Sequence, residues 1–90
     1  MTNLELVNEI LAHYNTHMAA QIAAIDKFKE ADDEIFKCFV RATFPPDIDF
    51  AEVMRQAKKR DNAREQMIEA FQLMYADFVR LAQAIGNWIE

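Results

Sequence analysis

The chain is divided by Pro45-Pro46-Asp47-Ile48-Asp49, the one strong helix breaker in its 90 residues. Neither proline can donate a helical hydrogen bond, and Pro45 also restricts the backbone of Phe44, so a helix cannot run through this point. The whole chain has one Gly and two Pro, which is too little turn chemistry for a β-meander or a sandwich. We therefore expect one all-α domain, residues 1–90, with a turn at 45–48 between two long helical arms.

Each arm begins with the signature of a helix start. Thr2 and Asp49 each stand three residues before a glutamate, Glu5 and Glu52, and this is the capping-box pattern that satisfies free N–H groups at a helix N-terminus. The arms are therefore predicted at 3–44 and 49–89.

Apolar residues in the second arm recur at alternating spacings of three and four, which is the heptad pattern of a helix packed on one partner helix. The second-arm stripe is Phe50, Val53, Ala57, Arg60, Arg64, Met67, Phe71, Met74, Phe78, Leu81, Ile85 and Trp88. The first-arm stripe is Leu4, Val7, Leu11, Tyr14, Met18, Ile22, Ile25, Phe28, Asp32, Ile35, Phe39 and Ala42. Irregular spacing between Met18 and Phe28, beside the weak helix formers at 14–17, predicts a kink or break there.

These patterns predict a long antiparallel helical hairpin with a kinked or broken N-terminal helix. Folding the arms back at the prolines pairs residues whose numbers add to about 93. The acidic run 30–34 then lies against the basic run 58–64, and Asp32 faces Arg60, Asp61 and Arg64. Charge and hydrophobicity therefore agree on one register.

Arg60 and Arg64 occupy seam positions that call for apolar residues, and a buried guanidinium without a partner is costly. One interpretation pairs them with Asp32 as a polar layer that sets the register. The other gives them a phosphate ligand, since arginine presents a planar fork of donors, and Lys29 at about the height of Arg64 adds a third cation. The residue pattern leaves both interpretations open.

Tyr14 has two interpretations as well. It is either a core aromatic residue whose hydroxyl reaches water, or a platform for a nucleobase beside Asn15. Glu9, His13 and His17 recur at four-residue intervals, but a fourth ligand is missing, so we expect a solvated face and no metal. Cys38, the single cysteine, reads as a small core residue.

No phosphate-cradling Gly loop, nucleophile elbow or isolated carboxylate pair occurs, so we expect a protein that is not an enzyme and needs no cofactor. The net charge of −5 argues against general DNA or RNA binding. No signal-like segment opens the chain, and no apolar run reaches the length of a membrane span. We expect a cytoplasmic protein with no membrane partner.

Three segments resemble a known family of helical-hairpin phage proteins that counter CBASS immunity. They are Tyr14-Asn15, the stretch Ile22-Ala23-Ala24-Ile25-Asp26-Lys27-Phe28-Lys29, and Ala63-Arg64-Glu65-Gln66-Met67-Ile68-Glu69-Ala70-Phe71 after the turn. The shared features are a Tyr with a polar neighbour, a Lys 15 residues after that Tyr, and an Ala-Arg pair that opens a helical stretch ending in Phe. Together these segments cover the middle of both arms.

The resemblance implies a sponge that binds cyclic oligonucleotide second messengers without cleaving them and so prevents activation of CBASS effectors. It implies compact homohexamers that hold cyclic dinucleotides of the 3′,3′-cGAMP type between protomers, with separate sites for cyclic trinucleotides. By the same resemblance Tyr14 would stack on a base and Lys29 would pair with phosphate. Asn15 and Arg64 are assigned less directly, with the trinucleotide site as one place for them. Arg60 is a further ligand-binding candidate, from its seam position alone.

Helix geometry limits how such a site can be built. Fifteen helical residues rise about 22 Å, so Tyr14 and Lys29 of one straight arm cannot reach the same small ligand. The site would have to be shared between chains, or the helix would have to bend. Apolar residues seven or fourteen residues apart beside the main seam favour a homo-oligomer; they are Met54, Ile68, Tyr75, Ala82 and Ile89.

Two other functions fit the same pattern. The chain could be a helical protein-binding module or inhibitor that uses its acidic surface against a basic host protein. It could also be a structural homodimer in which two hairpins form a four-helix bundle and the arginines are satisfied by acidic side chains alone.

Overall fold

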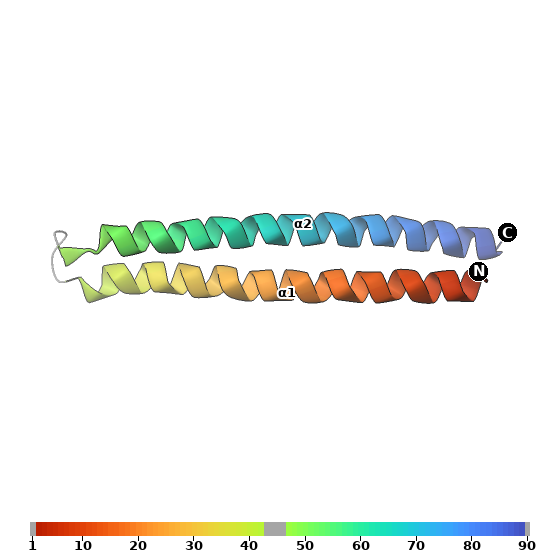
Figure 1. Ribbon diagram of the computed structural model, residues 1–90, viewed down its shortest axis with the longest axis horizontal. Coiled ribbons are helices and arrows are strands. Elements are labelled where there is room, and N and C mark those ends of the chain that lie inside the picture. The colour runs from red at the N-terminus through yellow and green to blue at the C-terminus, as the bar shows by residue number, and fades with distance from the viewer. Residues whose placement is uncertain (1, 43–46, 90) are drawn as a thin grey trace.

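The computed structural model describes the backbone of residues 2–42 and 47–89, and the side chains of these ranges as far as Gly86. Two long helices, α1 (Asn3–Arg41) and α2 (Phe50–Ile89), lie side by side and run in opposite directions (Figure 1). The Cα trace measures 67 × 15 × 13 Å, and the described ranges contain no strand. The all-α helical hairpin predicted from the sequence is confirmed.

Both predicted helix starts carry a capping side chain. The backbone N–H of Glu5 donates to Thr2 Oγ1 and that of Glu52 donates to Asp49 Oδ1, each at 3.1 Å. Helix α1 ends at Arg41, three residues before the predicted end of the first arm at 44, and Ala42 is already extended. The predicted turn at 45–48 falls partly on residues 43–46, which lie outside the described residues.

Helix α1 is one uninterrupted α-helix of 39 residues. It continues through the segment between Tyr14 and Phe28, where the sequence predicts a kink or break. Thr16 is accommodated by a hydrogen bond from its hydroxyl to the carbonyl of Ala12, at 3.0 Å, which leaves the helix continuous. Helix α2 supports α1 along its length (Figure 1), and such tertiary packing outweighs weak intrinsic helix propensity.

Two contacts between the helices establish the register. His17 on α1 bonds to Asp77 on α2, and Asp32 on α1 bonds to Arg60 on α2. The residue numbers of these pairs add to 94 and 92, so the predicted register of about 93 is confirmed.

The seam between the helices is rich in alanine. On α2 the buried positions recur every seven residues and are Gln56, Ala63, Ala70, Asp77 and Ala84. The corresponding row on α1 is Ile10, His17, Ala24, Ala31 and Cys38, of which the first and the two alanines are buried. Larger residues such as Phe28, Met67, Met74 and Leu81 are half-buried between these layers.

The predicted seam of α2 is therefore wrong at most of its alternate positions. Phe71, Phe78 and Ile85 are 59%, 60% and 38% exposed, and Arg64 is also exposed. Each lies one residue after a small seam residue. The sequence interpretation placed the largest apolar side chains between the helices, whereas alanine layers let two helices approach closely and leave the aromatic row outside.

The aromatic row belongs to one side of the hairpin. A step of one residue rotates the side chain by about 100°, and because the helices run in opposite directions, the residues just after the seam turn to the same side on both. We call this side the apolar face. Its exposed large apolar residues are Leu4, Leu11, Met18, Ile22, Phe36, Phe39, Phe50, Met54, Ile68, Phe71, Tyr75, Phe78 and Ile85.

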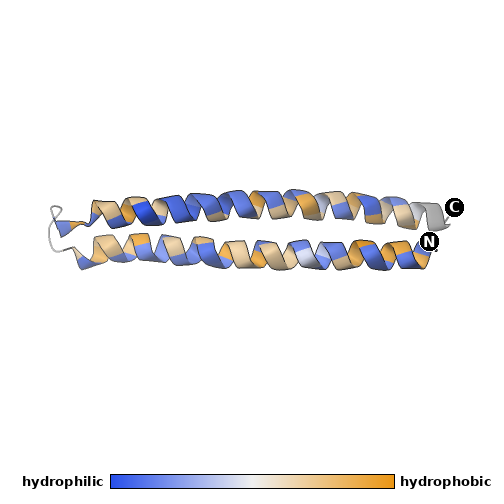
Figure 2. Ribbon diagram, viewed as in Figure 1, coloured by the Kyte–Doolittle hydropathy of each residue, from blue (hydrophilic) through white to orange (hydrophobic). Residues whose placement is uncertain are grey.

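The residues just before the seam form the opposite side, which is polar. Lys27, Glu30 and Glu34 from α1 and Lys59, Asn62 and Gln66 from α2 line one groove of about 500 Å³ with an alanine floor. Hydrophobic and hydrophilic residues accordingly alternate along both helices (Figure 2). The hairpin therefore has one apolar face and one polar face along its length.

Candidate functional site

Lys29 and Arg64 lie across the hairpin from one another. Both are exposed, both stand one residue after the seam, and their numbers add to 93, so they occupy the same level of the apolar face. Arg64 Nη2 is 3.5 Å from Asp61 Oδ1 of its own helix, while Lys29 has no hydrogen bond or ion pair with any described residue. An anion at this level would meet two cations, only one of which already has a partner.

Arg60 pairs with Asp32, as one of the two interpretations of the sequence predicts. Its Nη1 donates to Asp32 Oδ1 at 3.1 Å across the hairpin, and Arg60 is half-buried while the Asp32 side chain is 60% exposed. Arg64 does not share Asp32. The two arginines therefore have different roles: Arg60 joins the two helices, and Arg64 extends from the apolar face.

Apolar side chains border the Lys29–Arg64 level on both sides. Ile25 and Ile68 stand one turn away on one side, and Phe36 stands beyond Asp32 on the other. Phe36 and Ile68 are 65% and 52% exposed. A ligand with both phosphate and flat ring surfaces would find cations next to apolar area here.

Tyr14 and Asn15 lie far from this level. Tyr14 is half-buried in the seam near the N-terminal end of α1, and Asn15 is exposed on the apolar face. Because α1 is continuous, the 15 residues between Tyr14 and Lys29 span about 22 Å along the helix. The structure therefore places Lys29 at the level of Arg64 but leaves Tyr14 and Asn15 apart from them within one chain.

The sequence interpretation missed the pair His17–Asp77. His17 Nδ1 lies 2.6 Å from Asp77 Oδ2, and Asp77, at 4% exposed, is the only charged residue buried in the described ranges. Arg80 Nη1 lies 3.8 Å from the other oxygen of Asp77, and the ring of His13 packs edgewise on His17. The hairpin register places residue 17 opposite residue 77, so the register was the sequence signal that could have predicted this contact.

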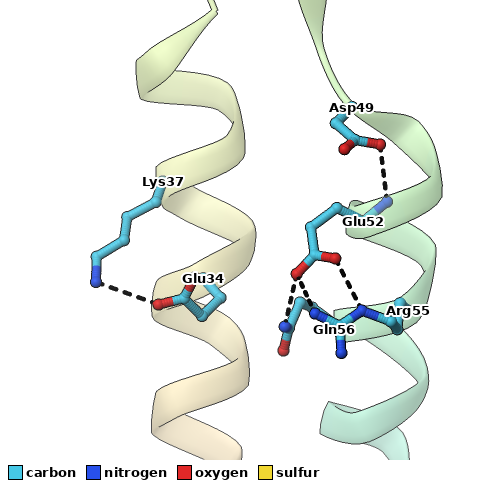
Figure 3. Close-up of polar contacts among 6 residues, drawn as sticks. All are labelled: Glu34, Lys37, Asp49, Glu52, Arg55 and Gln56. Atoms are coloured by element: carbon cyan, nitrogen blue, oxygen red, sulfur yellow. Dashed lines mark hydrogen bonds and ion pairs between the residues drawn. The ribbon is translucent and has the colours of Figure 1, made fainter.

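Each helix has ion pairs of its own near the end of the hairpin that carries the turn (Figure 3). Glu52 accepts from Arg55 Nε and Nη2 at 2.8 and 2.6 Å and from Gln56 Nε2 at 2.8 Å. The hydrogen bond from Arg55, followed by that from Gln56, lowers the pKa of Glu52 to about 2. Hydrogen bonds to Asp33 and Glu34 likewise raise the pKa of Lys37.

Metal and membrane sites were also considered from the sequence. Across residues 2–42 and 47–86, no three His, Cys, Asp or Glu side chains are placed to hold a metal ion together. His17 binds Asp77, while Glu9 and His13 are exposed. In the part of the chain that the structure describes, neither helix combines the length and apolarity that crossing a bilayer requires.

No protein family, curated protein or solved structure matches this chain.

Proposed function

We propose that this protein binds and sequesters cyclic di- and trinucleotide second messengers without cleaving them, and that it acts as a phage immune-evasion protein against CBASS. The observation that carries the proposal is the level of the apolar face where Lys29 and Arg64 oppose each other. Two cations with apolar neighbours suit a ligand that combines phosphates with nucleobases. Lys29 carries the larger part, because it has no partner among the described residues.

The proposal requires two chains for each ligand. Tyr14 and Asn15, assigned to the site by the resemblance, lie about 22 Å along α1 from Lys29 and Arg64. An uninterrupted helix cannot bring them to one small molecule. A second hairpin with its apolar face against the first would supply the missing side chains, in agreement with the homo-oligomer, and specifically the homohexamer, that the resemblance implies.

Sequestration rather than turnover fits the chemistry of this level. A lysine and an arginine bind and neutralise phosphate, and two carboxylates of this region are already paired, Asp32 with Arg60 and Asp61 with Arg64. The site is thus an anion receptor by composition. Tight binding, at a protein concentration above that of the messenger, would suffice to deprive a CBASS effector of its activating messenger.

Calorimetric titration with 3′,3′-linked cyclic dinucleotides and with cyclic trinucleotides tests the proposal. We expect micromolar or tighter binding, and we expect Lys29→Ala to abolish it while the far-UV helix signal stays unchanged. Lys58→Ala removes an exposed lysine of α2 away from this level and is the matched control. Absence of binding to every cyclic nucleotide tested would refute the function; binding that survives Lys29→Ala would refute the site.

The alternative function is that of a helical module that inhibits or recruits a host protein. The exposed apolar face favours it, because thirteen large apolar side chains on one side are typical of a protein-binding surface. A stable complex with one host protein, together with the absence of any nucleotide ligand, would support this alternative.

A further inference from the structure

His13 and His17 stand one turn apart on α1, and their rings meet edge-on with centroids 6.5 Å apart. Residues four apart are neighbours on a helix surface, so both imidazoles can reach one small ligand. Residue 13 stands two heptads before Lys27, which lines the polar groove, so His13 belongs to the polar face. His13 is exposed, and His17 lines a second hollow of about 370 Å³ on the same face. The space beside the two rings is therefore open to an incoming ion.

Asp77 determines which nitrogen of His17 is available to a ligand. Asp77 Oδ2 lies 2.6 Å from His17 Nδ1, and an ionised carboxylate can only accept, so Nδ1 carries the hydrogen. The lone pair of the neutral ring is then on Nε2. Histidines that bind metal ions almost always donate their other ring N–H to a carboxylate, a carbonyl or water, which fixes the tautomer and the orientation of the ring. His17 has this arrangement with a carboxylate that is 4% exposed.

We propose that His13 and His17 bind a divalent transition-metal ion, with Asp77 as the residue that positions His17. Neutral imidazole is a good ligand for Zn²⁺, Cu²⁺ and Ni²⁺. The protein supplies two ligands, because no third His, Cys, Asp or Glu among the described residues is placed to join them. Water occupies the other positions, so the ion exchanges more readily than an ion in a closed structural site. The sequence alone predicts no metal here, and the contact with Asp77 is what the structure adds.

The two rings need one adjustment to share an ion. Metal–nitrogen bonds of about 2.0–2.1 Å at a tetrahedral ion place the two ring centroids about 5 Å apart, which is less than the observed 6.5 Å. His17 is held by Asp77, whereas His13 has no hydrogen bond or ion pair with any described residue. Rotation of the exposed His13 side chain therefore closes the distance without a movement of either helix.

The charges around the two histidines permit a cation. Arg80 is a neighbouring positive charge, but its Nη1 lies 3.8 Å from Asp77 Oδ1 and its side chain is 46% exposed. Water and the carboxylate therefore screen its repulsion of an ion. Glu9, one turn before His13, is exposed and negatively charged, and the protein has a net charge of −5. The overall field attracts cations.

The ion would also stabilise the hairpin. It bonds to His17 on α1, and His17 bonds to Asp77 on α2, so the oriented site exists only when the two helices are in register. The unfolded chain does not hold the two rings one turn apart, and a ligand that prefers the folded chain raises its apparent stability. The Lys29–Arg64 level lies on the apolar face, so this metal site does not depend on the proposed binding of nucleotides.

Calorimetric titration of the full chain with copper, zinc and nickel chlorides tests the site. We expect one ion per chain, with Cu²⁺ bound most tightly, and a thermal midpoint that rises with metal concentration. His13→Ala, at an exposed position, should abolish this binding. Asp77→Asn should lower the affinity roughly 10–100-fold while the far-UV helix signal is retained. Asn8→Ala, which removes another exposed polar side chain of α1, is the matched control and should bind as the unaltered protein does.

Imidazole nitrogen spectra identify the ligands directly, because His13 and His17 are the only histidines of the chain. Zn²⁺ should shift the ring nitrogen signals of both, with Nε2 of His17 as the bonded atom. Absence of binding by all three ions, or binding that His13→Ala leaves unchanged, would overturn the site. An affinity that Asp77→Asn leaves unchanged, or Zn²⁺ on Nδ1 of His17, would overturn the role of Asp77.

Discussion

The carboxylate of Asp77 is buried, so removing its partner His17 should destabilise the protein more than removing Asp77 itself. His17→Ala removes the group 2.6 Å from Asp77 Oδ2 and leaves a carboxylate that is 4% exposed. A buried polar group left unsatisfied costs about 1–3 kcal/mol. Arg80 stays 3.8 Å from the other oxygen, but its side chain is 46% exposed and offsets little. We expect His17→Ala to lower the free energy of unfolding by about 2 kcal/mol.

The opposite substitution should be well tolerated. Asp77→Ala leaves His17, whose side chain is 25% exposed and can bond to water instead. The new alanine also continues the row formed by Ala63, Ala70 and Ala84, each seven residues apart. Asp77→Ala removes the buried carboxylate itself, so it leaves no buried charge without a partner. We therefore expect Asp77→Ala to change the free energy of unfolding by less than about 1 kcal/mol, and to rescue most of the loss caused by His17→Ala.

Urea unfolding followed by far-UV circular dichroism measures these differences, with all variants at the same protein concentration because self-association adds to apparent stability. For a chain of this size, about 2 kcal/mol also corresponds to a fall of roughly 8–16 °C in the thermal midpoint. Equal losses for the two single variants, or a double variant whose loss is the sum of both, would refute the argument that Asp77 depends on His17.

Two further predictions concern the turn end and the seam. Because hydrogen bonds from Arg55 lower the pKa of folded Glu52 from 4.5 to about 2, they stabilise the hairpin above pH 4.5 and this stabilisation is lost as the pH falls towards 2. The unfolding midpoint of Glu52→Gln should therefore depend less steeply on pH in that window, and an unchanged slope would contradict the assignment. Ala70→Leu should lower the free energy of unfolding by about 1–3 kcal/mol, because the larger side chain forces the close-packed helices apart. Ala19→Leu, on the exposed outer side of α1, should lower it by less than about 0.5 kcal/mol. Urea unfolding measures both, and equal effects would argue against the alanine seam.

Much of the fold follows from local chemistry in the sequence. Thr2 and Asp49 cap the two helices as predicted, and the scarcity of glycine and proline excludes a sheet protein. The hairpin register follows from chain geometry and places Asp32 against Arg60, where the structure finds an ion pair. These features depend on neighbours along the chain or on the length of the arms, so a sequence pattern suffices to predict them.

The candidate site was predictable only in part. Lys29 and Arg64 share a level because the register is simple arithmetic, but the sequence pattern placed Arg64 inside the seam, and the structure places it outside. The contact between His17 and Asp77 was missed because the pattern assigned Phe78, rather than Asp77, to the interior. Both errors have one origin, the choice between two adjacent rows of α2.

Local residue patterns are enough to predict two capped helices, their antiparallel register and the presence of heptad spacing. It did not determine which heptad row closes the hairpin, because the row containing Ala63 and Ala70 and the row containing Arg64 and Phe71 differ by one residue and have the same period. The packing of one helix against the other selects the row. Alanine rows permit the closer approach of two helices, so they pack within the hairpin, and the aromatic row is left at its surface.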